Sequence, residues 1–300
     1  MSRRTLVRCA TVLTGVLAVA ILGVAGLIAW RNYRSAHSLL EADPPSKLLA
    51  SPRLAGVAGL TAVSFVSADR LRLAAWYVPS RNGAAVVLAH GTNSDRSSML
   101  PEIRLLADAG FGVLAFDWPG LGESEGEVRW DGQARRALTA AVDWLASRSE
   151  VDPGRMGGLG FSIGGYVLTQ VAAQDPRLRA VVLEAPPPSF EDYMQVHARR
   201  WGYLSYWPAW LAIHNSGLLD HAFDALRLIP RIAPRAVLLL GGTKDTEIPS
   251  PLVSRMFAAA GNPKAVWIVD GAGHGNYSSV AGAQYATRLT AFFNANLRDH

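Results

Sequence analysis

The sequence predicts an α/β fold: a mostly parallel central sheet flanked by helices. Two observations carry this prediction. From residue 61 onward, short apolar runs are followed by segments with helical periodicity, and this alternation is typical of βαβ units. In addition, half of the 300 residues are apolar and only 18% are charged, which is the composition of a globular protein with a sizeable core.

The elements follow one another without an internal repeat or a low-complexity tract. Short apolar runs bounded by turn-forming residues indicate strands, and longer amphipathic segments between them indicate helices. The expected strands are 61–66, 71–78, 84–89, 112–116, 155–159, 180–183, 236–240 and 265–269. The expected helices are 98–109, 132–147, 163–173, 251–260 and 279–297.

One segment interrupts the alternation, because residues 186–234 contain no obvious strand. The segment lies between two core strands, so we expect an insertion that caps the strand ends within a single domain at 61–300. Large aromatic side chains are concentrated in it: Phe190, Tyr193, Trp201, Tyr203, Tyr206, Trp207 and Trp210.

The N-terminal segment is expected to cross a membrane. Residues 9–30 carry no charge, and as a helix they would span roughly 33 Å, enough for a hydrocarbon core of about 30 Å. We therefore expect a membrane anchor at residues 1–35 and a connector at 36–60, where prolines and glycines interrupt any long element. A cleavable signal peptide is the alternative, because Ala18-Val19-Ala20 resembles a cleavage site. The flanking arginines favour a cytoplasmic N-terminus and an extracytoplasmic domain.

Charge and cysteine content exclude several classes of partner. Five arginines against Glu41 and Asp43 give residues 1–45 a charge of +3, so the rest of the chain carries little of the total of +5. Without a basic run there, nucleic acid is not an expected partner. The single cysteine, Cys9, allows no internal disulfide and no cysteine-based metal site. We expect no metal, no cofactor and no obligate protein partner.

A G-x-S-x-G motif at residues 160–164 places Ser162 between an apolar strand and a helical run. This strand–turn–helix context exposes a serine hydroxyl, and small glycines allow the sharp turn to close. A second match at residues 122–126 contains Ser124, which lacks this context and has a glutamate on each side. Ser162 is therefore the predicted nucleophile.

A serine nucleophile needs a base, and the base needs an acceptor that orients it. His274 lies between glycines in a loop directly after a terminal strand, a better position for a base than the early His90. Asp245 and Glu247 both follow the preceding strand, and we favour the shorter Asp245 as the orienting acid.

Four motifs together resemble the α/β-hydrolase superfamily, in particular its serine hydrolases with an N-terminal membrane segment. They are residues 90–92, residues 117–124, the Ser162 turn, and residues 241–249 with Gly273-His274. The resemblance covers about residues 60–300. It implies an oxyanion hole formed by the backbone N–H groups of Thr92 and Ile163, and a structural role for residues 117–124.

The resemblance also implies a function: hydrolysis of an acyl ester or thioester through an acyl-enzyme on Ser162. The substrate would be a small-molecule or lipid-like acyl compound. Trp207 and Trp210 would line an apolar slot for the acyl chain, whereas in the alternative interpretation the aromatic rings of the insertion are ordinary core. Two other functions stay open: a peptidase on the same fold, and a non-catalytic binding protein tethered to the membrane.

Overall fold

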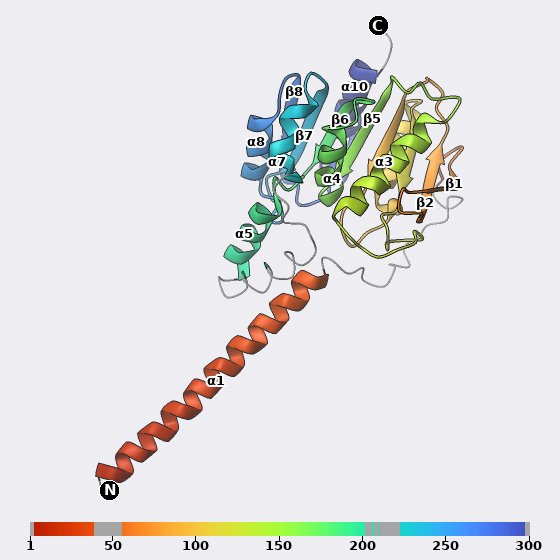
Figure 1. Cartoon of the computed structure of the whole chain (residues 1–300). Coiled ribbons are helices and arrows are strands. Elements are labelled where there is room, and N and C mark those ends of the chain that lie inside the picture. The colour runs from red at the N-terminus through yellow and green to blue at the C-terminus, as the bar shows by residue number, and fades with distance from the viewer. Residues whose placement is uncertain (1–2, 39–55, 202–205, 207–209, 211–222, 298–300) are drawn as a thin grey trace.

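The computed structural model describes residues 3–38, 56–201, 206, 210 and 223–297. Its centre is one sheet of eight strands in the order β1-β2-β4-β3-β5-β6-β7-β8 (Figure 1). The strands are β1 (Thr61–Val66), β2 (Arg72–Val78), β3 (Ala85–Ala89), β4 (Gly112–Phe116), β5 (Met156–Phe161), β6 (Leu178–Glu184), β7 (Ala236–Gly242) and β8 (Lys264–Val269).

All pairings from β4 to β8 are parallel, whereas β1 and β2 are antiparallel to their neighbours. The prediction of an α/β fold with a mostly parallel sheet is therefore confirmed. In parallel sheets both faces are covered, which explains why the central strands are continuous apolar runs. Every residue of β3, for example, is buried.

Helices cover both faces of the sheet. In Figure 1, α3 and α4 lie in front of the sheet, and α10 lies behind it, where it contacts α2, β5 and β6. Among the described residues of the domain, the helices and 3₁₀ turns are η1 (Arg96–Met99), α2 (Leu100–Asp108), α3 (Gly132–Ala146), α4 (Ile163–Ala172), α5 (Phe190–Trp201), α7 (Ala225–Leu228), η4 (Ile229–Ile232), α8 (Ser250–Ala259), α9 (Tyr277–Ala281) and α10 (Ala283–Leu297).

The helix α3 shows how the sequence specifies such an element. The Asp131 side chain caps it by accepting a hydrogen bond of 2.8 Å from the backbone N–H of Gln133. Its buried residues recur at spacings of three and four, which turns one apolar stripe toward the sheet. These residues are Ala134, Ala137, Leu138, Ala141, Val142 and Leu145.

The expected closing helix at 279–297 is wrong in one respect, because two helices occupy this region. The helix α9 starts at Tyr277 and ends at Ala281, and α10 starts at Ala283. Between them Gly282 has a φ of +52°. A right-handed helix cannot continue through a positive φ, and glycine adopts that conformation at little steric cost.

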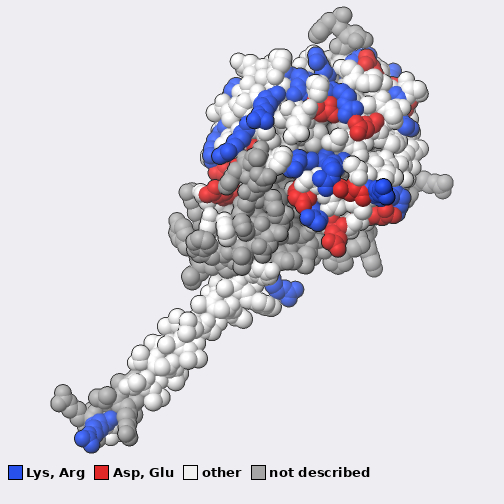
Figure 2. Space-filling view, in the orientation of Figure 1, with Lys and Arg blue, Asp and Glu red and all other residues white. Residues whose placement is uncertain are grey.

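The N-terminal helix α1 extends from Arg3 to Ser38, three residues beyond the expected anchor. Its stretch Thr11–Arg31 is long and apolar enough to cross a membrane, and an N-terminal signal sequence has the same properties. Figure 2 shows this helix without charged side chains along its middle and with arginine near its ends, whereas charges of both signs are scattered over the visible face of the domain.

Part of the insertion at 186–234 is described, namely α5, α7 and η4. The Phe190 ring of α5 packs edge-on against Tyr166 of α4, with 5.1 Å between ring centroids. Trp210 is half-buried and packs against the hydrophobic core, and Trp207 lies outside the described residues.

Candidate active site

Ser162 occupies a sharp turn between β5 and α4. Its backbone has φ +52° and ψ −120°, a conformation that costs a non-glycine residue on the order of 1–3 kcal/mol. The surrounding structure holds it there. The Ser162 N–H donates to the carbonyl oxygen of Glu184 at 2.8 Å, and the Ser162 carbonyl accepts from the Tyr166 N–H at 3.0 Å. The serine is half-buried at the carboxyl edge of the sheet.

The first turn of α4 approaches the end of β3 at backbone distance, and this approach requires glycine at two positions around Ser162. A Cβ atom at Gly164 would lie 2.1 Å from the Ala89 carbonyl oxygen and 2.6 Å from that of His90. A Cβ atom at Gly160 would lie 2.6 Å from the Gly164 carbonyl oxygen. The first turn of α4 is therefore pressed against the end of β3, which fixes where Ser162 lies relative to the following loop.

The structure brings the three predicted residues together, although Ser162 is 112 residues away from His274 in the sequence. The Nε2 atom of His274 lies 3.1 Å from the Ser162 Oγ, and its Nδ1 atom lies 2.9 Å from the Asp245 Oδ2. A carboxylate only accepts hydrogen bonds, so Nδ1 carries the proton and Nε2 is left to accept the serine proton. This is the arrangement that general-base activation of a serine requires.

Several further contacts hold Asp245, whose side chain is fully buried. Its Oδ1 atom accepts the backbone N–H groups of Glu247 at 2.9 Å and Ile248 at 2.8 Å. The Tyr277 hydroxyl donates to its Oδ2 atom at 3.4 Å, and burial raises the pKa of Tyr277, which keeps that hydroxyl protonated. Of the two acids that the sequence leaves open, Asp245 faces the imidazole, and Glu247 contributes its backbone N–H to Asp245. Tyr277 has no distinguishing signal in the sequence.

The two residues expected to supply oxyanion donors flank Ser162. Ile163 is the first residue of α4, and N–H groups in the first turn of a helix have no partner within the helix. Thr92 follows Gly91, and a Cβ atom at Gly91 would lie 3.5 Å from the Ser162 Cβ. Both residues therefore lie on segments that touch the serine, as an oxyanion hole would require.

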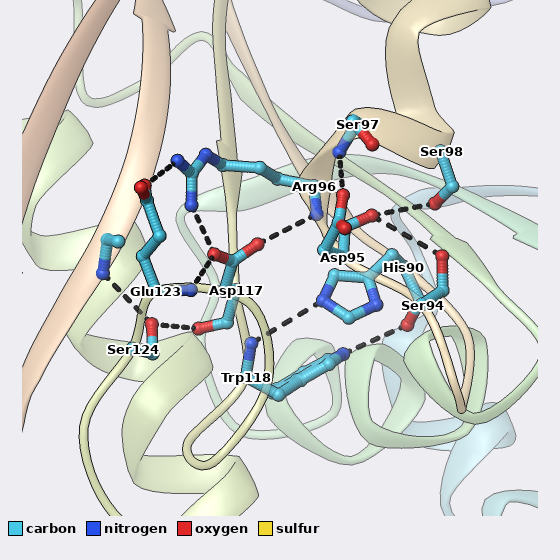
Figure 3. Close-up of polar contacts among 11 residues, drawn as sticks. His90, Ser94, Asp95, Arg96, Ser97, Ser98, Asp117, Trp118, Glu123 and Ser124 are labelled. Atoms are coloured by element: carbon cyan, nitrogen blue, oxygen red, sulfur yellow. Dashed lines mark hydrogen bonds and ion pairs between the residues drawn. The ribbon is translucent and has the colours of Figure 1, made fainter. Parts of the chain in front are cut away.

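Figure 3 shows that the segment around Ser124 holds the loop after β3 in place. The Asp117 carboxylate accepts the backbone N–H groups of Arg96 at 2.8 Å and Glu123 at 2.9 Å, and it pairs with the Arg96 guanidinium. Burial raises the pKa of Asp117 to about 6, and the charge of Arg96 opposes that rise. The Ser124 hydroxyl donates to the Asp117 carbonyl at 2.7 Å and accepts the Ala74 N–H at 2.9 Å. These contacts give Ser124 a structural role.

His90 also has a structural environment. It is fully buried, and burial lowers its pKa to about 4, so it is neutral at physiological pH. Its Nδ1 atom lies 2.8 Å from the Gly91 carbonyl oxygen. Its backbone carbonyl accepts the indole N–H of Trp118 at 2.9 Å (Figure 3). The histidine thus connects the end of β3 to the loop after β4.

A second polar cluster, which the sequence does not predict, lies next to the Ser162 turn. The Tyr285 hydroxyl lies 2.7 Å from a carboxyl oxygen of Glu184 and 2.8 Å from one of Glu102. Burial raises the pKa of both glutamates, that of Glu184 to about 8. One hydroxyl has one proton, so bridging both carboxyl groups requires a second proton on one of them. At least one carboxyl group of the cluster is therefore neutral. The cluster is linked to the proposed nucleophile through Glu184, whose backbone carbonyl accepts the Ser162 N–H.

Within the described parts of the chain, no group of three or more histidine, cysteine, aspartate or glutamate side chains is arranged to hold a metal ion.

Comparison with known proteins assigns the family. The family model of X-Pro dipeptidyl-peptidase (S15 family) matches residues 69–227, just over half of the chain, including Ser162 but not Asp245 or His274. An uncharacterized protein of Mycobacterium tuberculosis, Rv2307c, is 35% identical over 209 residues, which are 69% of either chain. The thiohydrolase aneE of Aspergillus aculeatus is 31% identical over 129 residues, 41% of either chain.

Solved structures show the same fold. The Pyrococcus furiosus esterase Pf2001 superposes with a TM-score of 0.72 at 21% identity, covering 86% of this chain and 98% of the esterase. At that identity the likeness shows the fold alone. Together with the sheet order and the family match, it establishes that this chain has the α/β-hydrolase fold and belongs to the X-Pro dipeptidyl-peptidase (S15) family.

Proposed function

We propose that this protein is a serine hydrolase that cleaves an acyl ester or thioester, with Ser162 as nucleophile, His274 as base and Asp245 as orienting acid. One observation carries the proposal: the continuous chain of hydrogen bonds from the Ser162 Oγ through the imidazole to the buried Asp245 carboxylate. Such a chain activates a hydroxyl that is otherwise a weak nucleophile.

In the first half-reaction, the Ser162 Oγ attacks the substrate carbonyl while His274 Nε2 takes the hydroxyl proton. The oxyanion is stabilised by the backbone N–H groups of Ile163 and Thr92, and one such donor is typically worth on the order of 10²–10³ in rate. His274 then protonates the leaving alcohol or thiol, and the acyl group stays on Ser162. In the second half, His274 activates a water molecule that releases the acid and restores the serine.

One similarity favours an acyl thioester or ester as substrate, because the related protein aneE is named a thiohydrolase. However, the same arrangement of serine, histidine and aspartate also supports amide hydrolysis. A second candidate is therefore a peptidase, and the family model of X-Pro dipeptidyl-peptidase is the observation that favours it.

The nucleophile is tested with a fluorophosphonate probe, which forms a covalent adduct with an activated serine. We expect the wild type to be labelled and to hydrolyse p-nitrophenyl esters. The Ser162→Ala variant should lose labelling and at least 10³-fold in turnover, because the attacking oxygen is gone. Ser124→Ala removes two structural hydrogen bonds and should cost about 1–2 kcal/mol in stability, yet keep most of the labelling.

Labelling of folded Ser162→Ala at the wild-type level would contradict the assignment, and a wild type that is neither labelled nor active would favour the non-catalytic binding protein. The substrate class is tested on the wild type with acyl esters of increasing chain length, acyl thioesters and X-Pro dipeptide anilides. The proposal requires ester or thioester turnover to exceed anilide turnover. The reverse order would support the peptidase.

We further propose that residues 1–35 anchor the domain at 61–300 to a membrane, through the uncharged stretch of α1. Full-length protein should stay in the membrane fraction through carbonate and high-salt washes, since about 20 apolar residues would leave the bilayer only at great cost. Removal of residues 1–40 should yield a soluble protein that the fluorophosphonate still labels. A mature chain that starts after Ala20 would show instead that the segment is a cleaved signal.

A further inference from the structure

Phe161, the residue before the proposed nucleophile, lies at the meeting point of three segments. It is the last residue of β5, and its side chain is half-buried. Its ring lies against the imidazole of His274, with 4.8 Å between ring centroids and 45° between ring planes. The sequence motif specifies no residue type at this position, so the contact is visible only in the structure.

Two glycines make room for the same ring. A Cβ atom at Gly91 would lie 3.0 Å from the ring carbons Cδ1 and Cε1 of Phe161. A Cβ atom at Gly275 would lie 2.7 Å from the ring carbon Cζ. Gly275 also has a φ of +83°, which by itself favours glycine, but Gly91 has no such conformation. At Gly91 the next nearest atom is the Ser162 Cβ at an ordinary 3.5 Å, so the ring of Phe161 is the principal obstacle to a side chain there.

The imidazole needs such a contact. Its hydrogen bond to Asp245 fixes the position of Nδ1, but that bond alone leaves the ring plane free to tilt about this point. A tilt would move Nε2 away from the Ser162 Oγ, which lies 3.1 Å from it. The Phe161 ring, in contact with the imidazole and confined between Gly91 and Gly275, supports the face of the imidazole against such a tilt.

On the basis of the proposed serine-hydrolase function, we propose that Phe161 is a positioning residue. Its ring sets the tilt of His274 and, through Gly91, the distance between Ser162 and the loop that contains Thr92. In this role Phe161 does not contact the reacting atoms. It acts through His274 and through the loop that contains Thr92. Misplacement of a reacting group by about 1 Å costs on the order of 10²-fold in rate.

The first test replaces the ring. We expect Phe161→Ala to lower kcat about 10²-fold and to slow fluorophosphonate labelling of the folded protein by a similar factor, while KM changes less than about threefold. Phe292→Ala is the matched control, because Phe292 is also a half-buried phenylalanine but lies on α10 against Phe293. This control should lower the melting temperature and leave kcat unchanged.

The second test is a double-mutant cycle between the ring and the glycine that accommodates it. In the wild-type background, Gly91→Ala should push the ring aside and lower kcat at least tenfold. In the Phe161→Ala background the same substitution should cause no further loss, because the obstacle is gone. Purely additive losses, or a Phe161→Ala variant with wild-type kcat, would overturn the proposal.

The outcomes separate this proposal from the one on which it rests. If the wild type is labelled at Ser162 while the Phe161 variants behave as the wild type, the assignment of Ser162, His274 and Asp245 is upheld and the positioning role of Phe161 is refuted. If the wild type is neither labelled nor active on any substrate of the panel, the proposed function fails, and the positioning role fails with it.

Discussion

Asp245→Asn is expected to lower kcat on substrates of this protein by about 10⁴-fold, with little change in KM or in melting temperature. The orientation of the new amide gives the reason. The Oδ1 position accepts two backbone N–H groups, those of Glu247 and Ile248, so the amide oxygen must take that position. The NH₂ group then faces His274, and Nδ1 becomes an acceptor. The proton moves to Nε2, which can no longer accept one from Ser162.

The measurement is steady-state kinetics on the best ester substrate, with a thermal unfolding curve for each variant. Glu247→Gln is the matched control, since it keeps the backbone N–H that Asp245 accepts and changes only the second acidic side chain after β7. It should retain most of the activity. An Asp245→Asn variant with more than a tenth of the wild-type kcat would show that His274 does not depend on this carboxylate.

Gly164→Ala is expected to have the largest effect on stability, a loss of more than about 4 kcal/mol or failure to fold. The added Cβ would overlap the Ala89 and His90 carbonyl oxygens, and neither backbone group can move without displacing β3 at the centre of the sheet. The free energy of unfolding from urea titration measures the effect. Because the same contact positions Ser162, any folded fraction should also be labelled slowly.

Gly273→Ala provides the control for this substitution. Gly273 lies next to His274, yet a Cβ atom there would have its nearest neighbour, the Lys244 carbonyl oxygen, at 3.8 Å, and its φ is not positive. We expect a change in stability of less than about 1 kcal/mol. A Gly164→Ala variant as stable as Gly273→Ala would contradict the close approach of α4 to β3.

Much of the architecture could be predicted from the sequence because local patterns specify it. The central strands are buried on both faces and are therefore uninterrupted apolar runs, as β3 and β4 show. The sequence predicts most strand bounds to within two residues, and those of β4 at 112–116 agree in full. The strand–turn–helix context that distinguishes Ser162 from Ser124 is also local. The sequence predicts one closing helix where the structure has α9 and α10, because a glycine such as Gly282 is tolerated in a helical pattern and only its positive φ divides the two helices.

Local sequence patterns specify the succession of strands and helices, the uncharged stretch of α1 and the residue types at Ser162, Asp245 and His274. Which of these groups meet depends on the tertiary structure. The strand order places β7 and β8 beyond β6, so loops far apart in the sequence converge at one edge. There Asp245 faces His274 and Glu247 does not, Phe161 fits between Gly91 and Gly275, and Tyr285 joins two buried glutamates. These contacts depend on distances between segments, which composition and periodicity do not encode.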